Sequence, residues 1–492
     1  MHKELAVAIN TSEKMLKFIS VDQSMPEKRS ADERSSDFNE IYKDFMTDKA
    51  TEQASRCSQC GIPFCHIHCP LGNNIPDWLN LTVEGRLEDA YALASSTNNM
   101  PEICGRICPQ DRLCEGNCVI EKDFDAVTIG SVEKFIADTA WENGWVKPFT
   151  PNMERHQSVG IIGAGPAGLA AAEQLRIAGF QVHIYDRYDR AGGLLTYGIP
   201  GFKLEKDIVE RRTKRLSDSG IVFHLGFEVG DDATLEELRT KHDALLIATG
   251  VYKSRPLKIP GSQLGNIIES LNYLTASNRK GLGDTVPSFE DGTLDAKGKN
   301  VVVIGGGDTA MDCVRTAIRQ GAKSVKCLYR RNRENMPGSA QEVANAEEEG
   351  VEFIWLTGPE AFVGTDKVEV VRAYQMRLGA PDPSGRQTPE PVPSSNHDIA
   401  CDMAILALGF DPEELPAMFK APELDVTRWG TVLVDQQSLM TNLDGVFAAG
   451  DIVRGASLVV WAIRDGRDVA EGIQNYLLEK LSEQSNKQEA VA

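Results

Sequence analysis

The residues of this chain best suited to chemistry are cysteines near its N-terminus. Eight of the eleven cysteines fall between positions 57 and 118. They form two groups with short spacings: Cys57, Cys60, Cys65 and Cys69, then Cys104, Cys108, Cys114 and Cys118. Close thiolates of this kind, with a proline directly after Cys69 and Cys108, are typical of ligand runs for iron–sulfur clusters. We therefore expect two [4Fe–4S] clusters in this region.

A structural zinc site is the main alternative, because four thiolates can also hold a zinc ion tetrahedrally. The region contains one Cys-x-x-Cys pair, Cys57 and Cys60, whereas zinc ribbons usually contain two. His66 and His68 lie inside the first group and could serve as ligands. Because eight cysteines already suffice, we expect both histidines to be bystanders.

A glycine-rich motif further along the chain indicates a first dinucleotide site. It follows a β-branched run that begins at Ser158 and precedes a helical pattern. Such glycines allow a tight turn, a close approach to a pyrophosphate and close helix–strand packing, while the helix N-terminus supplies amides. Asp186 ends the next apolar run, where a carboxylate can bind a ribose hydroxyl. The expected residues are Gly163, Ala164, Gly165, Pro166, Ala167, Gly168, Asp186 and Arg187. A glycine turn without a ligand is the alternative.

A second motif repeats this pattern, with Ala310 in place of the third glycine. The position equivalent to Asp186 is occupied by Arg330. A guanidinium can bind a 2′-phosphate bidentately, whereas a carboxylate would repel it, so this site should prefer NADPH over NADH. The alternative is a solvated basic turn. The expected residues are Gly305, Gly306, Gly307, Asp308, Thr309, Arg330, Arg331 and Arg333.

Three downstream segments resemble the FAD-binding segments of the glutathione-reductase-like flavoproteins. They contain Gly193 and Leu194, Thr249 and Gly250, and Gly450 and Asp451. Disulfide-type members of that superfamily have a cysteine pair shortly after the double glycine, but this sequence has none there. The resemblance implies FAD, and electrons must leave it without a dithiol.

A helix expected near Leu458 and Val459 resembles the segment of these flavoproteins whose N-terminus faces the flavin. The positive end of its dipole would stabilise reduced flavin there. A packed amphipathic helix without that role is the alternative.

Helices and strands must position these residues, and their sequence patterns predict an α/β protein. Residues 1–152 contain helix-like stretches at 76–81, 84–95 and 132–142 without strand alternation, which predicts a helical Fe–S domain. From residue 157, short β-branched runs alternate with glycines and helical patterns, as in βαβ units.

We therefore expect two Rossmann-like domains of glutathione-reductase type after the helical domain. The FAD-binding domain would comprise residues 153–298 and 410–480, and the NADPH-binding domain residues 299–409. A Pro-rich segment at 381–393 predicts a surface hairpin. The polar tail, 481–492, is expected to be flexible.

The charge of the chain disfavours some partners. Its formal net charge is −20, so nucleic acid or an anionic membrane would repel it. Residues 1–20 lack the apolar run of a secretion signal, and no later stretch is long enough to span a membrane. We expect a cytoplasmic protein with no nucleic-acid or membrane partner.

Segments along almost the whole chain resemble the small (β) subunits of NADPH-dependent glutamate synthase. They include residues 104–118, 126–133, 306–313 and 330–338, and a loop that ends with Lys203 and Leu204. The resemblance implies that NADPH is oxidised through FAD and that two [4Fe–4S] clusters pass electrons to a large FMN-containing subunit. That partner makes glutamate from glutamine and 2-oxoglutarate. Lys203 is expected at a cofactor, and hydride transfer itself calls for no catalytic side chain.

The N-terminal half of dihydropyrimidine dehydrogenase is similar to the same region and implies interleaved clusters. It implies one ligand set of Cys57, Cys60, Cys65 and Cys118. The other set would contain Cys69, Cys108 and Cys114, completed by Glu133 where that family has glutamine, or by Cys104.

Two other functions stay open on the sequence. One is a related NADPH-dependent oxidoreductase that feeds ferredoxin or a dihydropyrimidine dehydrogenase-type partner. The other is a non-catalytic redox-sensing subunit, against which the complete second motif with Arg330 argues.

Overall fold

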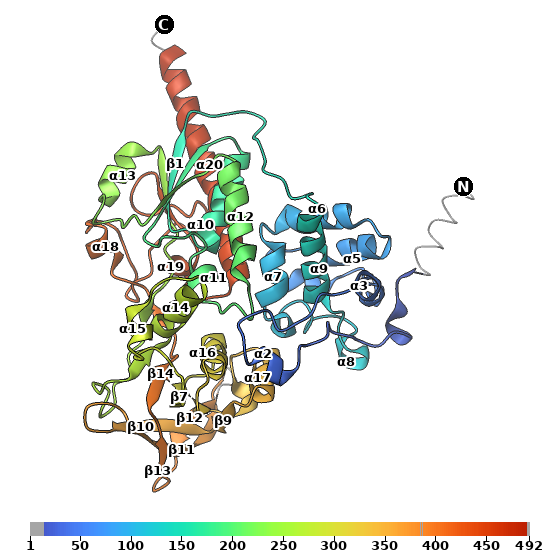
Figure 1. Ribbon diagram of the computed structural model, residues 1–492. Helices are drawn as coiled ribbons and strands as arrows, with labels where there is room; N and C mark the ends of the chain where they lie inside the picture. Colours follow the sequence, from blue (N-terminus) through green and yellow to red (C-terminus); the bar gives the residue numbers. More distant parts are fainter. Residues whose placement is uncertain (1–13, 384, 386, 490–492) are drawn as a thin grey trace.

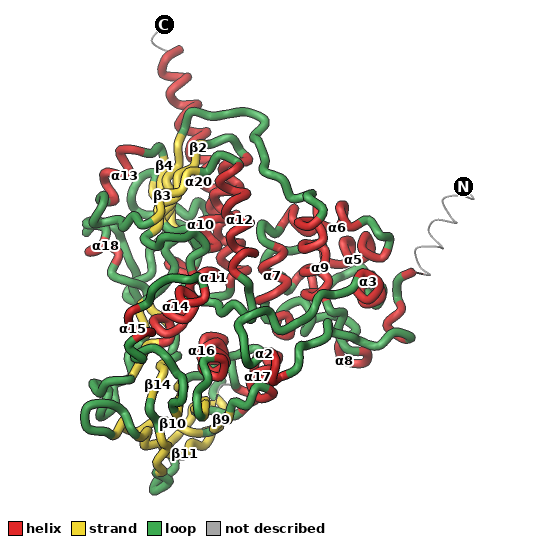
Figure 2. The backbone as a smooth tube through the Cα atoms, in the orientation of Figure 1, coloured by secondary structure: helices red, strands yellow, loops and turns green. Residues whose placement is uncertain are grey.

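The computed structural model describes residues 14–383, 385 and 387–489. It has three parts, with a group of N-terminal helices beside two α/β domains (Figure 1). Figure 2 shows that the strands lie in the two α/β domains. Among the described residues, no helix is both long enough and apolar enough to cross a lipid bilayer. The predicted fold class is confirmed.

The N-terminal part is helical, as predicted. Its longest helix, α9 (Ile129–Glu142), buries Ile129, Val132 and Ile136, which recur at helical spacing. Its core includes the fully buried Trp78. The other helices are α2 (Ala31–Arg34), α3 (Thr47–Ala54), α4 (Phe64–Ile67), α5 (Ile75–Val83), α6 (Leu87–Thr97), α7 (Pro101–Ile107) and α8 (Glu121–Phe124).

The first α/β domain contains a parallel five-stranded sheet in the order β16-β4-β1-β2-β3. The central strands are apolar along their length because helices cover both faces of such a sheet. The strands are β1 (Ser158–Ile162), β2 (Gln181–Asp186), β3 (Val222–Leu225), β4 (Ala244–Ile247) and β16 (Val446–Ala448). The helices are α10 (Pro166–Ile177), α11 (Leu194–Tyr197), α12 (Lys206–Asp218), α13 (Leu235–Lys241), α18 (Leu415–Met418), α19 (Asp451–Arg454) and α20 (Val459–Glu489).

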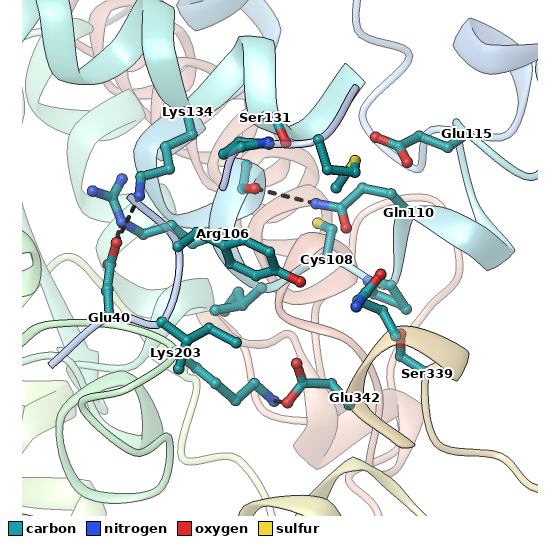
Figure 3. Close-up of a pocket in the computed structure, with 18 of the residues that line it drawn as sticks. Glu40, Arg106, Cys108, Gln110, Glu115, Ser131, Lys134, Lys203, Ser339 and Glu342 are labelled. Atoms are coloured by element: carbon teal, nitrogen blue, oxygen red, sulfur yellow. Dashed lines mark hydrogen bonds and ion pairs between the residues drawn. The ribbon is translucent and has the colours of Figure 1, made fainter. Parts of the chain in front are cut away.

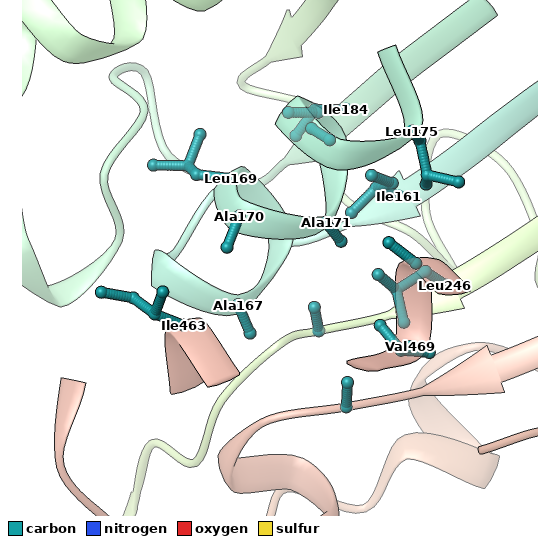
Figure 4. Packing of buried hydrophobic residues seen from close by; sticks show 14 of the residues in the cluster. Ile161, Ala167, Leu169, Ala170, Ala171, Leu175, Ile184, Leu246, Ile463 and Val469 are labelled. Carbon is teal, nitrogen blue, oxygen red and sulfur yellow. The ribbon is translucent and has the colours of Figure 1, made fainter. Parts of the chain in front are cut away.

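Small residues allow α10 and α20 to pack closely in this domain. Ala167 and Ala170 lie on the side of α10 that faces the segment carrying Ile463 and Val469 (Figure 4). A Cβ added at Gly466 would lie 2.3 Å from the Ala167 carbonyl oxygen. The start of α20 is thereby held against the glycine-rich turn that precedes α10.

The second α/β domain has a parallel sheet in the order β6-β14-β7-β8-β9. Its strands are β6 (Ile267–Glu269), β7 (Asn300–Ile304), β8 (Ser324–Tyr329), β9 (Glu352–Trp355) and β14 (Met403–Leu406). Its helices are α14 (Ser270–Gly281), α15 (Pro287–Glu290), α16 (Asp308–Arg319) and α17 (Ala340–Glu348). The short antiparallel pair β5 (Lys253–Ser254) and β15 (Phe410–Asp411) lies between the domains in sequence.

The expected boundary at residue 298 separates β6 from the sheet to which it belongs. β6 is hydrogen-bonded to β14, far along the chain, and so short a strand carries little sequence signal. We propose instead that the second domain begins at Ile267.

The Pro-rich segment contributes to a small antiparallel sheet. β11 (Val370–Pro381) pairs with β12 (Gln387–Pro391), which lies inside that segment. The predicted hairpin is thus present, and Pro389 and Pro391 lie on its edge strand β12, where prolines are tolerated. β10 (Thr357–Val363) and β13 (His397–Ala400) both pair with β11.

The flexibility expected for the tail, residues 481–492, stays a prediction, and the first part of that tail is helical. α20 continues to Glu489, and residues 490–492 lie outside the described residues. The segment is rich in Gln, Glu and Lys, which are good helix formers, so polarity alone does not end a helix.

Candidate functional site: two nucleotide turns and two groups of cysteines

The first glycine-rich turn connects β1 to α10. Gly163 has a φ of 113°, and a Cβ there would lie 2.4 Å from the Ala248 carbonyl oxygen. A Cβ at Gly168 would lie 2.0 Å from the Gly163 carbonyl oxygen. Gly165 faces open space instead. Gly163 and Gly168 therefore allow the turn to pack closely, and Gly165 leaves room for a ligand.

A cavity lies in front of this turn and has an empty volume of about 670 Å³, open solvent included. Most of the residues predicted for FAD line it, and they come from five separate segments. They are Gly163, Gly165, Pro166, Ala167, Asp186, Leu194, Thr249, Gly250, Asp451, Leu458 and Val459. Tyr252 and Ser457 also line the cavity and were not predicted, although each is close in sequence to a predicted residue. This cradle fits an extended dinucleotide.

Asp186 organises the turn as well as facing the cavity. Its carboxylate accepts hydrogen bonds from the backbone amides of Ala164 at 2.6 Å and Tyr188 at 2.8 Å. Burial raises its pKa above the usual range for aspartate. Each carboxylate oxygen can still accept a second hydrogen bond, for example from a ribose hydroxyl.

Arg187 lies at one end of this cradle, in an adjoining hollow of about 470 Å³ lined by aromatic residues. Its guanidinium pairs with both oxygens of Glu413, at 3.0 and 3.1 Å, and stacks over the Tyr252 ring. Glu413 was not predicted, because it approaches Arg187 from a distant part of the chain.

The second glycine-rich turn, between β7 and α16, has the same design. A Cβ at Gly305 would lie 2.2 Å from the Ala407 carbonyl oxygen, and one at Gly306 would meet the Tyr329 ring at 2.4 Å. Gly307 faces open space. The turn therefore presents an accessible helix N-terminus, where Asp308 and Thr309 begin α16.

The three predicted arginines have different surroundings. Arg330 is exposed, and neither it nor Arg331 forms an ion pair among the described residues. Arg333 is already paired with Glu347, at 2.6 and 2.8 Å. Arg330 and Arg331 are therefore available for a phosphate, whereas Arg333 holds the loop to α17.

Lys203 lies away from the cradle of the first turn. Its ammonium group contacts Asp312 at 2.9 Å and Glu342 at 3.5 Å, on α16 and α17. Burial lowers the pKa of Lys203, but the two carboxylates outweigh this and raise it overall. The contact joins the first α/β domain to the second, and Lys203 lines a cavity between the three parts of the molecule (Figure 3).

Four of the cysteines gather near α4. Burial and, to a smaller extent, the nearby Cys57, Cys118 and Cys60 together raise the pKa of the Cys65 thiol to about 12. Burial likewise raises the pKa of Cys57 to about 11, with Cys118 and Cys60 again close by. The chain thus brings together the first ligand set that was predicted.

The other four cysteines of the helical part line one small cavity of about 400 Å³, open solvent included. Cys69, Cys104, Cys108, Cys114 and Glu133 all contribute to its wall. Among the described residues, no three His, Cys, Asp or Glu side chains converge closely enough for a single metal ion. A four-iron cluster is wider than one ion, and a cavity ringed by thiols fits such a cluster.

Glu133 and Cys104 are held differently at this cavity. Glu133 is buried and accepts hydrogen bonds from the side-chain amides of Asn98 at 3.1 Å and Asn73 at 3.3 Å. Burial raises its pKa to about 8. The Cys104 thiol donates a hydrogen bond to the side-chain oxygen of Asn98 at 3.7 Å. Both side chains that could complete the second set are therefore present.

Two protein-family models match the chain. Residues 34–145 match "Dihydroprymidine dehydrogenase domain II, 4Fe-4S cluster", and residues 157–466 match "Pyridine nucleotide-disulphide oxidoreductase". The first match covers the two groups of cysteines, and the second covers both glycine-rich turns.

Curated relatives cover nearly the full length. The chain is 67% identical over 466 residues to the "Glutamate synthase [NADPH] small chain" of Azospirillum brasilense, covering 94% of this chain and 97% of the relative. It is 43% identical to the protein of the same name from Escherichia coli, covering 95% and 99%. Among solved structures, Mycobacterium tuberculosis FprA in complex with NADPH is similar, with a TM-score of 0.57 and 20% identity. That similarity covers 67% of this chain and 86% of FprA, and it shows a shared fold.

Proposed function

The chain belongs to the family of NADPH-dependent glutamate synthase small chains, and we propose that it is the electron-input subunit of such an enzyme. It oxidises NADPH by means of FAD and passes the electrons through two [4Fe–4S] clusters to a large FMN-containing subunit. That partner makes glutamate from glutamine and 2-oxoglutarate. A cytoplasmic location stays a prediction from the sequence.

The start of α20 carries this proposal. Leu458 and Val459 line the cradle of the first turn, and the next residue, Val460, lines the cavity of the second group of cysteines. Arg464 of the same helix donates a hydrogen bond to the carbonyl of Pro70, directly after Cys69, at 2.7 Å. Less than one helical turn therefore separates a dinucleotide site from a thiol-lined cavity, as electron transfer between them requires.

The protein contributes binding and orientation to this chemistry. FAD, when bound, can accept a hydride from nicotinamide and release electrons singly. The chain holds the dinucleotide with Gly165 and Asp186, and α20 directs the positive end of its dipole into the cradle. We propose no side chain as acid, base or nucleophile.

We propose the ligand sets that the sequence predicted. Cys57, Cys60, Cys65 and Cys118 hold the first cluster. Cys69, Cys108, Cys114 and Glu133 hold the second, and Cys104 is spare. Two amide donors fix one oxygen of Glu133 and leave the other free, which is how a ligating carboxylate is usually supported.

Replacement of Arg330 by alanine tests the nucleotide assignment. We expect the KM for NADPH to rise about 10- to 100-fold, since charged hydrogen bonds to a phosphate are lost. The KM for NADH should stay unchanged, because NADH has no 2′-phosphate. Steady-state reduction of an artificial acceptor measures both constants.

The matched control for Arg330→Ala is Arg377→Ala. Arg377 is an exposed arginine of the same domain that pairs with Glu390 on the neighbouring strand. Arg377→Ala should change neither the KM for NADPH nor the KM for NADH. If Arg330→Ala raises the KM for NADPH and the KM for NADH equally, the assignment of Arg330 to the 2′-phosphate is wrong.

Exposed apolar side chains surround the first group of cysteines and suggest where the large subunit binds. Ile62 is 65% exposed, Ile67 57% and Val119 55%, and each lies within two residues of Cys60, Cys65 or Cys118. Exposed apolar residues gathered in this way usually mark an interaction site. We propose that this apolar collar, Ile62, Ile67 and Val119, contacts the large subunit.

The double variant Ile62→Glu and Ile67→Glu tests the collar. Affinity for the separately purified large subunit should fall about tenfold or more, because interface anchors typically contribute that much. NADPH-dependent reduction of an artificial acceptor and iron content should not change. Trp429→Glu, which alters a 70% exposed side chain on the first α/β domain, serves as control. Unchanged affinity in the double variant would place the contact elsewhere.

A further inference from the structure

The loop between Cys108 and Cys114 contacts the second nucleotide turn directly. Arg112, in a 3₁₀ helix at Gln110–Arg112, donates hydrogen bonds to the Pro337 carbonyl and, at 3.2 Å, to the Asp308 carboxylate. The preceding Asp111 accepts hydrogen bonds from the Ser339 hydroxyl at 3.3 Å and the Ala340 amide at 3.0 Å. A loop that carries cluster ligands is thus joined to the domain that binds the pyridine nucleotide.

The partners of Arg112 are parts of the nucleotide site. Asp308 is the first residue of α16, directly after the open Gly307. Pro337 lies in the loop 332–339, which follows Arg330 and Arg331 and returns to the glycine-rich turn. Gly338 donates a hydrogen bond to the Gly306 carbonyl at 2.9 Å. Arg112 therefore connects the start of α16 to the loop that lies over the turn.

The contact between Arg112 and Asp308 lies at the edge of an open cavity and is not enclosed in a core. The cavity has an empty volume of about 870 Å³, open solvent included. Figure 3 shows Cys108 and Gln110 on one side of it, with Ser339 and Glu342 on another. Asp308 is part of its lining, and the Arg112 side chain is 41% exposed. A nucleotide at the turn can therefore reach this arginine from solvent.

The loop that carries Arg112 is held by local hydrogen bonds and by close packing at a glycine. The Gln110 carbonyl accepts hydrogen bonds from the amides of Glu115 at 3.0 Å and Gly116 at 3.1 Å. A Cβ at Gly116 would lie 1.8 Å from the Asp111 carbonyl oxygen, so only glycine fits. The Gln110 side chain also donates to the Gly105 carbonyl at 3.2 Å. Arg112 is thereby presented from a fixed base on the helical domain.

We propose that Arg112 is a positioning residue for the pyridine nucleotide, supplied by the Fe–S domain. It closes the loop 332–339 over the glycine-rich turn. It also neutralises the Asp308 carboxylate, which would otherwise repel a pyrophosphate at the start of α16. This inference rests on the proposed nucleotide site and goes beyond it, because it makes nucleotide affinity depend on the loop between two cluster ligands.

The test measures binding of NADP⁺ to the purified holoprotein by calorimetry. For Arg112→Gln we expect the Kd to rise about tenfold, which corresponds to about 1.4 kcal/mol. The kcat at saturating NADPH should stay unchanged while KM rises, since the arginine positions the nucleotide and takes no part in hydride transfer. Arg86→Gln is the matched control, because Arg86 is an exposed arginine of the same domain that pairs with Glu84 and Asp89. It should bind NADP⁺ like the wild type.

A second variant reaches the same contact from the nucleotide domain, in case Arg112→Gln loses iron. Ala340→Pro removes the amide that donates to Asp111. Proline is well tolerated at the first position of a helix, and Ser339, with φ −55° and ψ 134°, already has the conformation preferred before proline. We expect a weaker rise in Kd, about threefold, with iron content unchanged.

The outcomes separate the two proposals. If the wild type does not bind NADP⁺, the proposed function fails. If the wild type binds but Arg112→Gln and Ala340→Pro bind equally well, the positioning role is wrong and the contact only holds the domains together. A double-mutant cycle with Asp308→Asn completes the test: additive changes in Kd would contradict the role given to the Arg112–Asp308 pair.

Discussion

Replacing Gly168 with alanine is expected to yield a protein that purifies with little or no flavin. The new Cβ would lie 2.0 Å from the Gly163 carbonyl oxygen and 3.2 Å from a methyl group of Ile161. Both neighbours belong to the tightly packed junction of β1 and the glycine-rich turn, so α10 would have to move. Overpacking of this kind costs about 1–3 kcal/mol, and the displaced helix N-terminus would weaken FAD binding about 10- to 100-fold.

The flavin absorbance per chain after gel filtration measures this effect. Gly281→Ala is the matched control: Gly281 ends α14, and a Cβ there meets nothing within 4 Å. This control should retain its full flavin content. A Gly168→Ala protein that keeps stoichiometric FAD would show that the turn tolerates a side chain and that the cradle lies elsewhere.

Loss of one ligand of the second cluster is expected to stop electron output altogether. In Cys114→Ser, a proposed cluster ligand is removed from a cavity that adjoins α20 and therefore the flavin cradle. Iron should fall by about half, corresponding to one of two clusters. Glutamate formation with the large subunit should drop to background, whereas NADPH-dependent reduction of a flavin-specific dye should persist. Iron analysis and low-temperature electron paramagnetic resonance measure these changes.

The same measurements identify the fourth ligand. Cys104→Ser is the matched control for Cys114→Ser, because it removes a thiol from the same cavity and keeps its volume. We expect Cys104→Ser to retain both clusters and Glu133→Ala to lose the second. If Cys104→Ser loses iron and Glu133→Ala does not, the ligand assignment must be exchanged between the two residues.

Most of the residues that carry the chemistry of this protein can be recognised from short sequence patterns. The Gly168 position is explained within a short stretch of chain, because a Cβ there would meet the Gly163 carbonyl oxygen. The helices of the N-terminal part follow from apolar spacing, and the parallel strands from short apolar runs. For this reason the fold class, the nucleotide turns and the two groups of cysteines were all predictable from the sequence.

The tertiary structure decided which of the predicted residues are free to act. Arg330 and Arg333 are alike in sequence, but Arg333 is paired with Glu347 on a helix that folds back beside it. Lys203 was expected at a cofactor, and the structure pairs its ammonium group with carboxylates on α16 and α17. β6 joins its sheet through β14, more than a hundred residues later in the chain.

The contacts that connect the sites are also long-range. Arg112 and Asp308 are 196 residues apart in sequence, and neither is part of a motif that names the other. The adjacency of the cradle and the cysteine cavity likewise depends on α20 returning to pack against α10. Local residue spacing specifies the turns, the helices and the groups of ligands. It contains no information on which surfaces come into contact when distant segments pack. Those contacts between surfaces determine how the sites are coupled.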